Sequence, residues 1–188
     1  MARILIAYGT REGQTARIVD EMTLMLEAGG HDVDVQNLKQ SRPETLAAYD
    51  GTIVAASVHV GAYEHEVRRW VRDHVAELDA RPNAFVSVSL SAANHDAESI
   101  AGMDAVIQKF RDNTGWEPGR VVRFAGALVY SKYNWLVKRI LRRIVREQEN
   151  GRYMDMTRDY VLTDFDEVRK FSRDFGEAVR MVSPRLNA

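Results

Sequence analysis

Residues 7–15 combine hydroxyl, glycine and amide side chains directly after a short apolar run, and a helical pattern follows them. The segment therefore reads as a strand, a turn and the first turn of a helix. The first backbone N–H groups of a helix have no partners within it, and the helix dipole adds partial positive charge there. Gly13 allows the backbone to come close to a ligand, and Thr10, Gln14 and Thr15 supply side-chain donors. These features predict a turn that binds an anionic group such as a phosphate.

The same turn admits other interpretations. Thr10 can serve as the N-cap of the helix or as a phosphate ligand, because both roles need the same geometry. An ordinary capped turn between a strand and a helix is the alternative to an anion site. The Gly-Lys-Ser/Thr ending of a Walker loop and the G-x-G-x-x-G fingerprint are both missing, so neither nucleotide-binding motif accounts for the turn.

Apolar runs alternate along the chain with amphipathic segments, and this alternation predicts the order of the elements. Strands are expected at about 3–8, 31–36, 51–57, 84–90 and 121–130, and helices at about 13–28, 64–78, 97–113 and 166–181. Parallel strands need crossover connections, which are nearly always right-handed. The pattern therefore predicts a single α/β domain over residues 1–188, a doubly wound, mostly parallel five-stranded sheet with helices on both faces.

In such a sheet, ligands bind beyond the carboxyl ends of the strands, at the point where the strand order reverses. The loops after the first, third and fourth strands should therefore converge, and they are residues 10–15, 57–63 and 89–94. In the second loop, Tyr63 beside Gly61 could flank a planar ring or could equally be a core residue under the next helix. His59 could face a ligand or be an exposed loop histidine.

The composition excludes several classes of function. The chain has no cysteine, which rules out disulfides, thiolate metal sites and dithiol redox chemistry, so any electron transfer must use a bound cofactor. Its five histidines are scattered, and we expect no metal site. A G-x-S-x-G nucleophile elbow is absent. We find neither a signal-peptide pattern nor a run of eighteen apolar residues, and therefore expect a cytoplasmic protein that is soluble or peripheral to a membrane.

Several stretches together resemble the flavodoxin superfamily, namely residues 8–15, 56–58 and 124–130. Within that superfamily, other stretches look like the menaquinone-dependent protoporphyrinogen dehydrogenases. These are residues 87–90, residues 126–128 with Tyr130, Tyr133 and Trp135 after them, and residues 163–165. The likeness covers nearly the whole chain in order.

The resemblance implies a flavodoxin-like strand order of 2-1-3-4-5 and a noncovalent FMN. Its phosphate would lie in loop 10–15, and its ring between the loops that begin at Ser57 and Ser89, with Gly61 allowing a backbone group to approach the flavin N5 edge. The flavin would carry the chemistry, so the resemblance implies no catalytic acid or base. The cofactor-binding residues it implies are Thr10, Arg11, Glu12, Gly13, Gln14, Thr15, Ser57, Val58, His59, Val60, Gly61, Tyr63, Ser89, Leu90, Ser91 and Asn94.

The reaction implied by the resemblance is the oxidation of protoporphyrinogen IX in heme biosynthesis, with reducing equivalents passing through FMN to a quinone in the membrane. Three alternatives stay open. The chain could be a flavodoxin-like electron carrier without enzymatic activity, a flavoprotein quinone reductase with another substrate, or a flavin-binding regulatory module. A carrier is expected to have a strongly acidic rim near the flavin, whereas the most concentrated charge of this chain is basic.

That basic charge lies in an added segment at about residues 131–160, where a plain flavodoxin needs only a short connection. No acidic residue occurs from 118 to 146, although the whole chain has a net charge of -1. The basic residues of this interval are Arg120, Arg123, Lys132, Lys138, Arg139, Arg142, Arg143 and Arg146. A helix over 132–148 would collect its apolar residues in one arc of roughly 180° and its cations opposite.

Such a helix could lie on an anionic membrane at the inner face of the cell, near the quinone, or could bind an anionic substrate. The third interpretation is that its apolar arc packs on the sheet and its arginines are simply solvated. No nucleic-acid recognition motif accompanies the charge, so we expect no nucleic-acid partner.

Overall fold

The structure is a computed structural model that describes residues 1–11, 13–94, 96–128 and 160–182. Its centre is a five-stranded sheet in the order β2-β1-β3-β4-β5, with every neighbouring pair parallel. The strands are β1 (Arg3–Gly9), β2 (Asp32–Asn37), β3 (Gly51–Ser57), β4 (Asn83–Ser89) and β5 (Val121–Ala125). The predicted doubly wound sheet of order 2-1-3-4-5 is confirmed.

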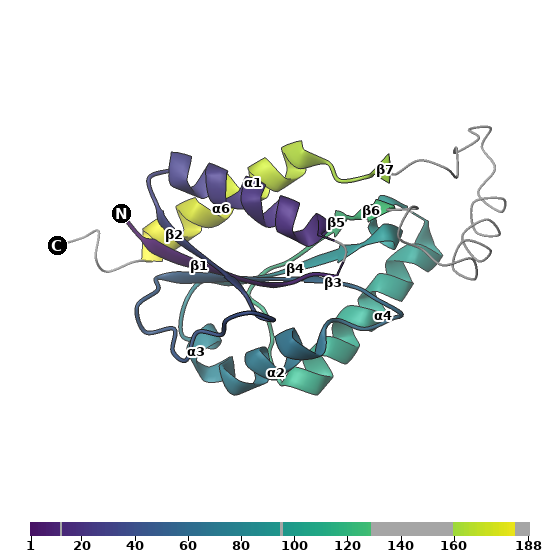
Figure 1. Ribbon diagram of the computed structural model, residues 1–188, viewed down its shortest axis with the longest axis horizontal. Coiled ribbons are helices and arrows are strands. Elements are labelled where there is room, and N and C mark those ends of the chain that lie inside the picture. Colours follow the sequence, from purple (N-terminus) through teal and green to yellow (C-terminus); the bar gives the residue numbers. More distant parts are fainter. Residues whose placement is uncertain (12, 95, 129–159, 183–188) are drawn as a thin grey trace.

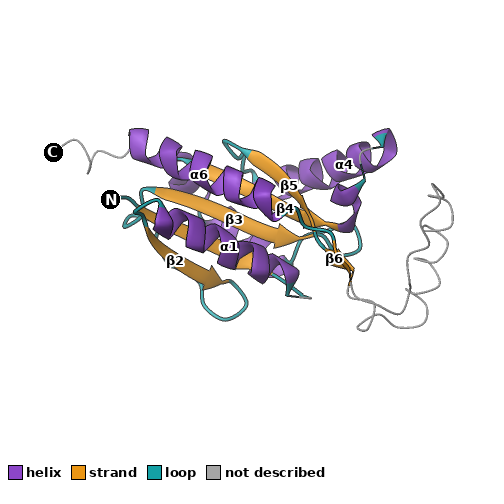
Figure 2. Cartoon of the chain, turned by 90° about the horizontal axis from the view of Figure 1, so that it is seen from above, coloured by secondary structure: helices purple, strands orange, loops and turns teal. Residues whose placement is uncertain are grey.

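Helices cover both faces of this sheet (Figure 1). One face carries α1 (Gln14–Ala28) and α6 (Phe165–Val182), which lie side by side in Figures 1 and 2. The other face carries α2 (His65–Asp73), α3 (Val75–Asp79) and α4 (Ala97–Thr114). A short 3-10 helix, η1 (Leu90–Ala93), follows β4, and a separate two-stranded sheet joins β6 (Ala127–Leu128) to β7 (Tyr160–Val161).

The core consists of two apolar layers, one on each side of the sheet. Successive side chains of a strand point to opposite faces, and β1 divides its side chains accordingly. Ile4 and Ile6 pack in the layer under α1 and α6, whereas Leu5 and Ala7 pack in the layer under α2 and α4. All four side chains are fully buried, as expected for a central parallel strand covered on both faces. The two layers thus hold the carboxyl ends of β1, β3 and β4 in fixed positions.

The single helix expected over residues 64–78 is divided into α2 and α3 at His74. The Nδ1 atom of His74 lies 2.8 Å from the carbonyl oxygen of Trp70, which a continuing helix would use as the acceptor for the His74 backbone N–H. That N–H donates instead to Val71, one residue closer. The side chain therefore competes with the helical ladder at this point.

The strand expected over residues 121–130 is shorter, because β5 ends at Ala125. Gly126 still donates its N–H to the carbonyl of Ser89, but its own carbonyl accepts from Leu162. The chain then leaves the main sheet and pairs antiparallel as β6 with β7. Residues 129–159, which include most of the predicted basic segment, lie outside the described residues. Every helix that the structure describes is too short or too polar to span a bilayer.

Candidate functional site

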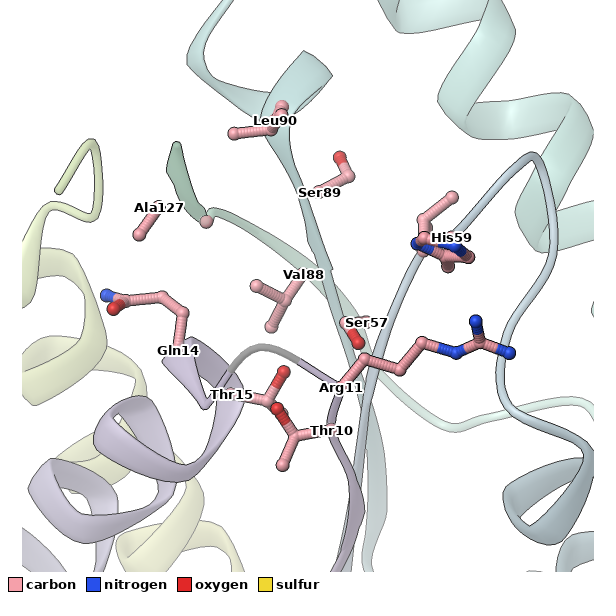
Figure 3. A pocket seen from close by; sticks show the side chains of 12 residues that line it. Thr10, Arg11, Gln14, Thr15, Ser57, His59, Val88, Ser89, Leu90 and Ala127 are labelled. Carbon is pink, nitrogen blue, oxygen red and sulfur yellow. The ribbon is translucent and has the colours of Figure 1, made fainter. Parts of the chain in front are cut away.

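A cavity that is open to solvent lies at the carboxyl edge of the sheet, where the loops after β1, β3 and β4 converge (Figure 3). The lining residues are Thr10, Arg11, Gln14, Thr15, Ser57, Val58, His59, Val88, Ser89, Leu90, Gly126 and Ala127. The convergence of the three predicted loops is therefore an observed feature of this fold.

The first loop leads directly into the N-terminus of α1. Gly13, in the left-handed conformation with a φ of 95°, occupies the N-cap position. Its N–H donates to the Thr10 hydroxyl at 3.1 Å, so Thr10 closes the turn from outside the helix. The first helical bond runs from Arg17 to the Gly13 carbonyl. The N–H groups of the first turn are consequently left for a ligand at this end of the helix.

Thr15 supplies a second unmet hydrogen-bonding group in this turn. Its side chain is 1% exposed, and its Oγ1 atom has no hydrogen-bond partner. A buried hydroxyl without a partner costs free energy, so this atom requires a partner that the described chain does not supply. Because Thr15 also lines the cavity, a bound anion would satisfy both its hydroxyl and the neighbouring helix N-terminus.

Gln14 connects this turn to the opposite wall of the cavity. Its side-chain Nε2 donates to the Thr163 hydroxyl at 2.8 Å, and Thr163 donates in turn to the Ala125 carbonyl at 2.6 Å. The start of α1 is thereby attached to the end of β5 and to the segment that precedes α6. Two consecutive hydrogen bonds across the layers hold the turn in one position relative to the sheet.

The charge around the cavity also favours an anion. Arg11 is the one permanently charged side chain among the described lining residues, and none of those residues is a carboxylate. Figure 3 shows Arg11 extending from the first loop on the side of His59. A second cation stands nearby, because the Lys39 Nζ donates to the Thr10 carbonyl at 2.9 Å. Both cations are exposed, so their attraction for an anion weakens with salt.

The second wall is the end of β3 and the loop after it. The Val58 N–H donates to the Val88 carbonyl at 2.8 Å and continues the sheet by one residue. His59 is exposed and pairs through its backbone with Ala62 in an isolated antiparallel bridge. The Ser57 hydroxyl donates to the buried Glu64 at 2.6 Å. Ser57, which lines the cavity, is therefore held in place by Glu64, which lies outside the cavity lining.

The third wall is formed by the ends of β4 and β5. The Ser89 side chain accepts from the Ala92 N–H and caps η1, and its carbonyl accepts from the Gly126 N–H at 3.0 Å. Val88, Gly126 and Ala127 line the cavity, although they were not among the predicted cofactor-binding residues. Gly126 and Ala127 directly follow the observed β5, but the strand expected over 121–130 placed them inside a strand, so the convergence of loops gave no signal for them.

Tyr63 does not line this cavity, and its contact with a ligand ring stays a prediction. Its side chain is 4% exposed, and its hydroxyl lies 2.8 Å from the Ser87 hydroxyl. The ring makes edge contacts with Phe85 and Phe110 at centroid distances of 5.0 and 5.1 Å. Burial raises the pKa of Tyr63 to about 12. Tyr63 is the core residue that the alternative interpretation described.

The other predicted residues that the structure describes do not line the cavity. Val60 and Gly61 form the tip of the second loop, with φ angles of 49° and 70°. Ser91 belongs to η1, and the Asn94 side chain donates to Ser99 at 3.4 Å. Gly13 shapes the first turn as described above, and Glu12 lies outside the described residues. As ligand contacts, these residues remain predictions. No group of three metal-ligating side chains occurs in the part of the chain that the structure describes.

Comparison with known proteins gives one family match. A family described as flavodoxin domain matches residues 5–155. The oxidised flavodoxin 2 of Bacillus cereus superposes with a TM-score of 0.56 at 18% identity, covering 94% of this chain and 99% of that structure. The likeness to this structure concerns the fold alone.

Two curated relatives are similar over nearly the full length. One is the protoporphyrinogen IX dehydrogenase [quinone] of Leishmania major, which is 32% identical over 187 residues, or 99% of this chain and 80% of the relative. The other is the protein of the same name from Escherichia coli strain K12, which is 30% identical over 172 residues, covering 92% of this chain and 93% of the relative.

Proposed function

The chain belongs to the flavodoxin domain family, and from that premise we propose that it is an FMN-dependent oxidoreductase that oxidises protoporphyrinogen IX and reduces a quinone. The observation that supports FMN as the cofactor is the buried Thr15 hydroxyl, which has no hydrogen-bond partner and lies at the cavity, at the N-terminus of α1. The substrate and the acceptor are supported by the full-length similarity to relatives that carry this name.

The described residues fit FMN at both of its ends. Thr10, Thr15 and the first turn of α1 provide hydroxyl and N–H donors for the phosphate, and Arg11 adds a positive charge at the mouth. The walls formed by β3, β4 and β5 provide the space for the ring. None of the described lining residues carries a carboxylate that would repel the phosphate.

When bound, FMN supplies the oxidation–reduction chemistry, taking hydrogen from the porphyrinogen and passing the reducing equivalents to the quinone. The chain itself binds and orients the cofactor. Thr15 and the start of α1 fix the phosphate, while Ser57 and Ser89 lie at the ends of the neighbouring strands β3 and β4, beside the space for the ring. The hydrogen bonds of Gln14 and Thr163 keep these two parts in register. No protein acid or base is assigned a step.

The test is quinone-dependent oxidation of protoporphyrinogen IX by the FMN-loaded protein in the absence of oxygen. Protoporphyrin formation, followed by its fluorescence, should continue through many turnovers with a water-soluble quinone. Without the quinone it should stop well short of one protoporphyrin per protein, because one FMN accepts only part of the electrons that a porphyrinogen must lose. A loaded protein that yields no porphyrin above the protein-free control would contradict the proposed reaction. Purified protein that cannot be reconstituted with FMN would contradict the cofactor as well.

An electron carrier of the flavodoxin type is the second candidate, because the fold alone allows it. The two candidates differ in turnover. A carrier would exchange electrons with a reduced ferredoxin partner and would give no sustained oxidation of protoporphyrinogen by quinone. The near-full-length similarity to the named dehydrogenases favours the enzyme.

We also propose that the protein contacts an anionic membrane surface through the basic interval at 132–146. The support is the sequence pattern alone, since these residues lie outside the described part of the structure. Each cation near an anionic surface contributes about 1 kcal/mol, so several together give measurable binding at low salt. Liposomes with anionic lipid should carry the protein upward in a flotation gradient, whereas neutral liposomes should not. Equal flotation with both would refute the proposal.

A further inference from the structure

Glu64 is a buried carboxylate beside the cavity that the proposed function does not yet use. It precedes α2, and its side chain is 5% exposed. The Ser57 hydroxyl donates to its Oε1 atom at 2.6 Å. Its Oε2 atom is buried without a hydrogen-bond partner. Such an atom is costly, which makes a purely structural role a poor account of Glu64.

The surrounding backbone makes room for this carboxylate. Gly9, the last residue of β1, has no Cβ, and an added one would lie 3.5 Å from Glu64 Oε2 and 2.5 Å from Val67 Cγ2. The carboxylate therefore sits behind the carboxyl ends of β1 and β3, the two strands that flank the reversal of strand order. Among the described residues, no lysine or arginine forms an ion pair with it. Its single hydrogen-bond partner there is Ser57.

We propose that Glu64 is a positioning residue that fixes the hydrogen-bonding polarity of Ser57 toward the FMN ring. This inference rests on the proposed binding of FMN. A serine hydroxyl has one proton to donate, and here that proton is directed to Glu64. Ser57 also lines the cavity, so the oxygen can present only lone pairs to a ligand. This point of the wall therefore accepts a hydrogen bond and selects an N–H group on the edge of the isoalloxazine ring.

Glu64 confers this polarity because a carboxylate can only accept. A neutral amide in its place could donate to the serine oxygen, and the hydroxyl proton would then be free to turn toward the cavity. Ser57 would lose its fixed role and with it part of its preference for an N–H group. The two residues therefore act as one unit, in which Ser57 makes the contact and Glu64 determines its sense.

The test is a double-mutant cycle on FMN affinity, measured by quenching of flavin fluorescence with Ser57→Ala, Glu64→Gln and the double variant. Loss of one neutral hydrogen bond weakens binding by about 2- to 13-fold, which we expect for Ser57→Ala. Glu64→Gln should weaken FMN binding in the wild-type background and have no further effect once Ser57 is alanine. Ser57→Thr, which keeps the hydroxyl, should restore most of the affinity.

Two controls separate this effect from damage to the fold or to the phosphate site. Ser172→Ala removes a buried serine hydroxyl from α6, away from the cavity, and should leave FMN affinity unchanged. Inorganic phosphate should compete with equal inhibition constants in the wild type and in Glu64→Gln, because the variant alters the ring contact alone. Independent, additive effects of the two substitutions would overturn the inference. Unchanged FMN affinity in both single variants, while the wild type binds FMN, would also overturn the inference. Failure of the wild type to bind FMN would instead overturn the proposed function.

Discussion

Replacing Thr15 with valine should stabilise the flavin-free protein and weaken its affinity for FMN. Valine keeps the branched shape of threonine and removes the hydroxyl, whose oxygen is buried without a partner. Leaving such a group unsatisfied costs about 1–3 kcal/mol, so its removal should raise the free energy of unfolding by about 1 kcal/mol or more. For a chain of this length, each kcal/mol moves the melting temperature by about 2–4 °C.

The effect on FMN has the opposite sign. A hydrogen bond from a hydroxyl to a charged phosphate contributes about 1.5–3 kcal/mol, which corresponds to roughly 10- to 150-fold in affinity. A ligand that binds only the native state stabilises it according to its concentration relative to its Kd. The Thr15→Val variant should therefore melt above the wild type without FMN and below it at saturating FMN. Melting curves over a series of FMN concentrations would show this crossing.

Thr52→Val is the matched control for this crossing. Thr52, the second residue of β3, is fully buried, and its hydroxyl also has no partner, but it lies at the end of the strand far from the cavity. Its replacement should raise the melting temperature by a similar amount and preserve that advantage at every FMN concentration. If Thr15→Val melts below the wild type without FMN, or binds FMN as tightly, the assignment of its hydroxyl to the phosphate is refuted.

Three further predictions concern the rest of the fold. A Cβ at Gly51 would lie 2.5 Å from a buried valine side chain, so Gly51→Ala should lower the free energy of unfolding, measured by urea denaturation, by about 1–3 kcal/mol. Gly102 lies in α4 with open space around it, so Gly102→Ala should raise the same free energy by about 0.5–1 kcal/mol. Burial lowers the pKa of His31 below its ordinary 6.5, so the unfolded chain binds the proton more tightly than the folded chain. The free energy of unfolding should therefore fall as the pH drops below about 6.5, and it should depend less steeply on pH in His31→Gln. Tyr63→Phe should lower the free energy of unfolding by about 1–3 kcal/mol, because it leaves the Ser87 hydroxyl without its partner, and should leave FMN affinity unchanged. Weaker FMN binding by this variant would contradict the prediction.

The fold could be predicted from the sequence because its signals are local and repeated. Continuous apolar runs such as those of β1 and β3 are typical of parallel strands buried on both faces, and each is followed by a helical pattern. The carboxyl edge then follows from topology, since parallel strands bring their ends together. Most of the lining of the cavity was found by this argument and not by any single motif.

The structure differs from the expectations where one specific side-chain contact, and not the pattern of apolar residues, decides the local arrangement. His74 interrupts a helix because its ring takes over a carbonyl, and the pattern of apolar residues contains no signal for that competition. Tyr63 follows a glycine loop, as a ligand-flanking residue would, but packing against Phe85 and Phe110 draws it into the core. The contact between Ser57 and Glu64 joins two residues whose spacing of seven matches no chemical motif.

The carboxyl edge of the sheet is where this chain departs from the rules that stabilise the rest of it. Thr15 and Glu64 leave buried polar atoms without partners there, although other parts of the core contain such atoms as well. Val60, a β-branched residue, adopts a positive φ while 92% exposed, so no packing of its side chain offsets the strain. Each departure lowers the stability of the flavin-free protein, and a ligand at this edge can recover the cost only at the atoms it touches. Because Thr15 lines the cavity directly, ligand binding should recover the cost of its unpaired hydroxyl. Glu64 reaches the cavity only through Ser57, so its cost stays in place and fixes the direction of the hydrogen bond at Ser57.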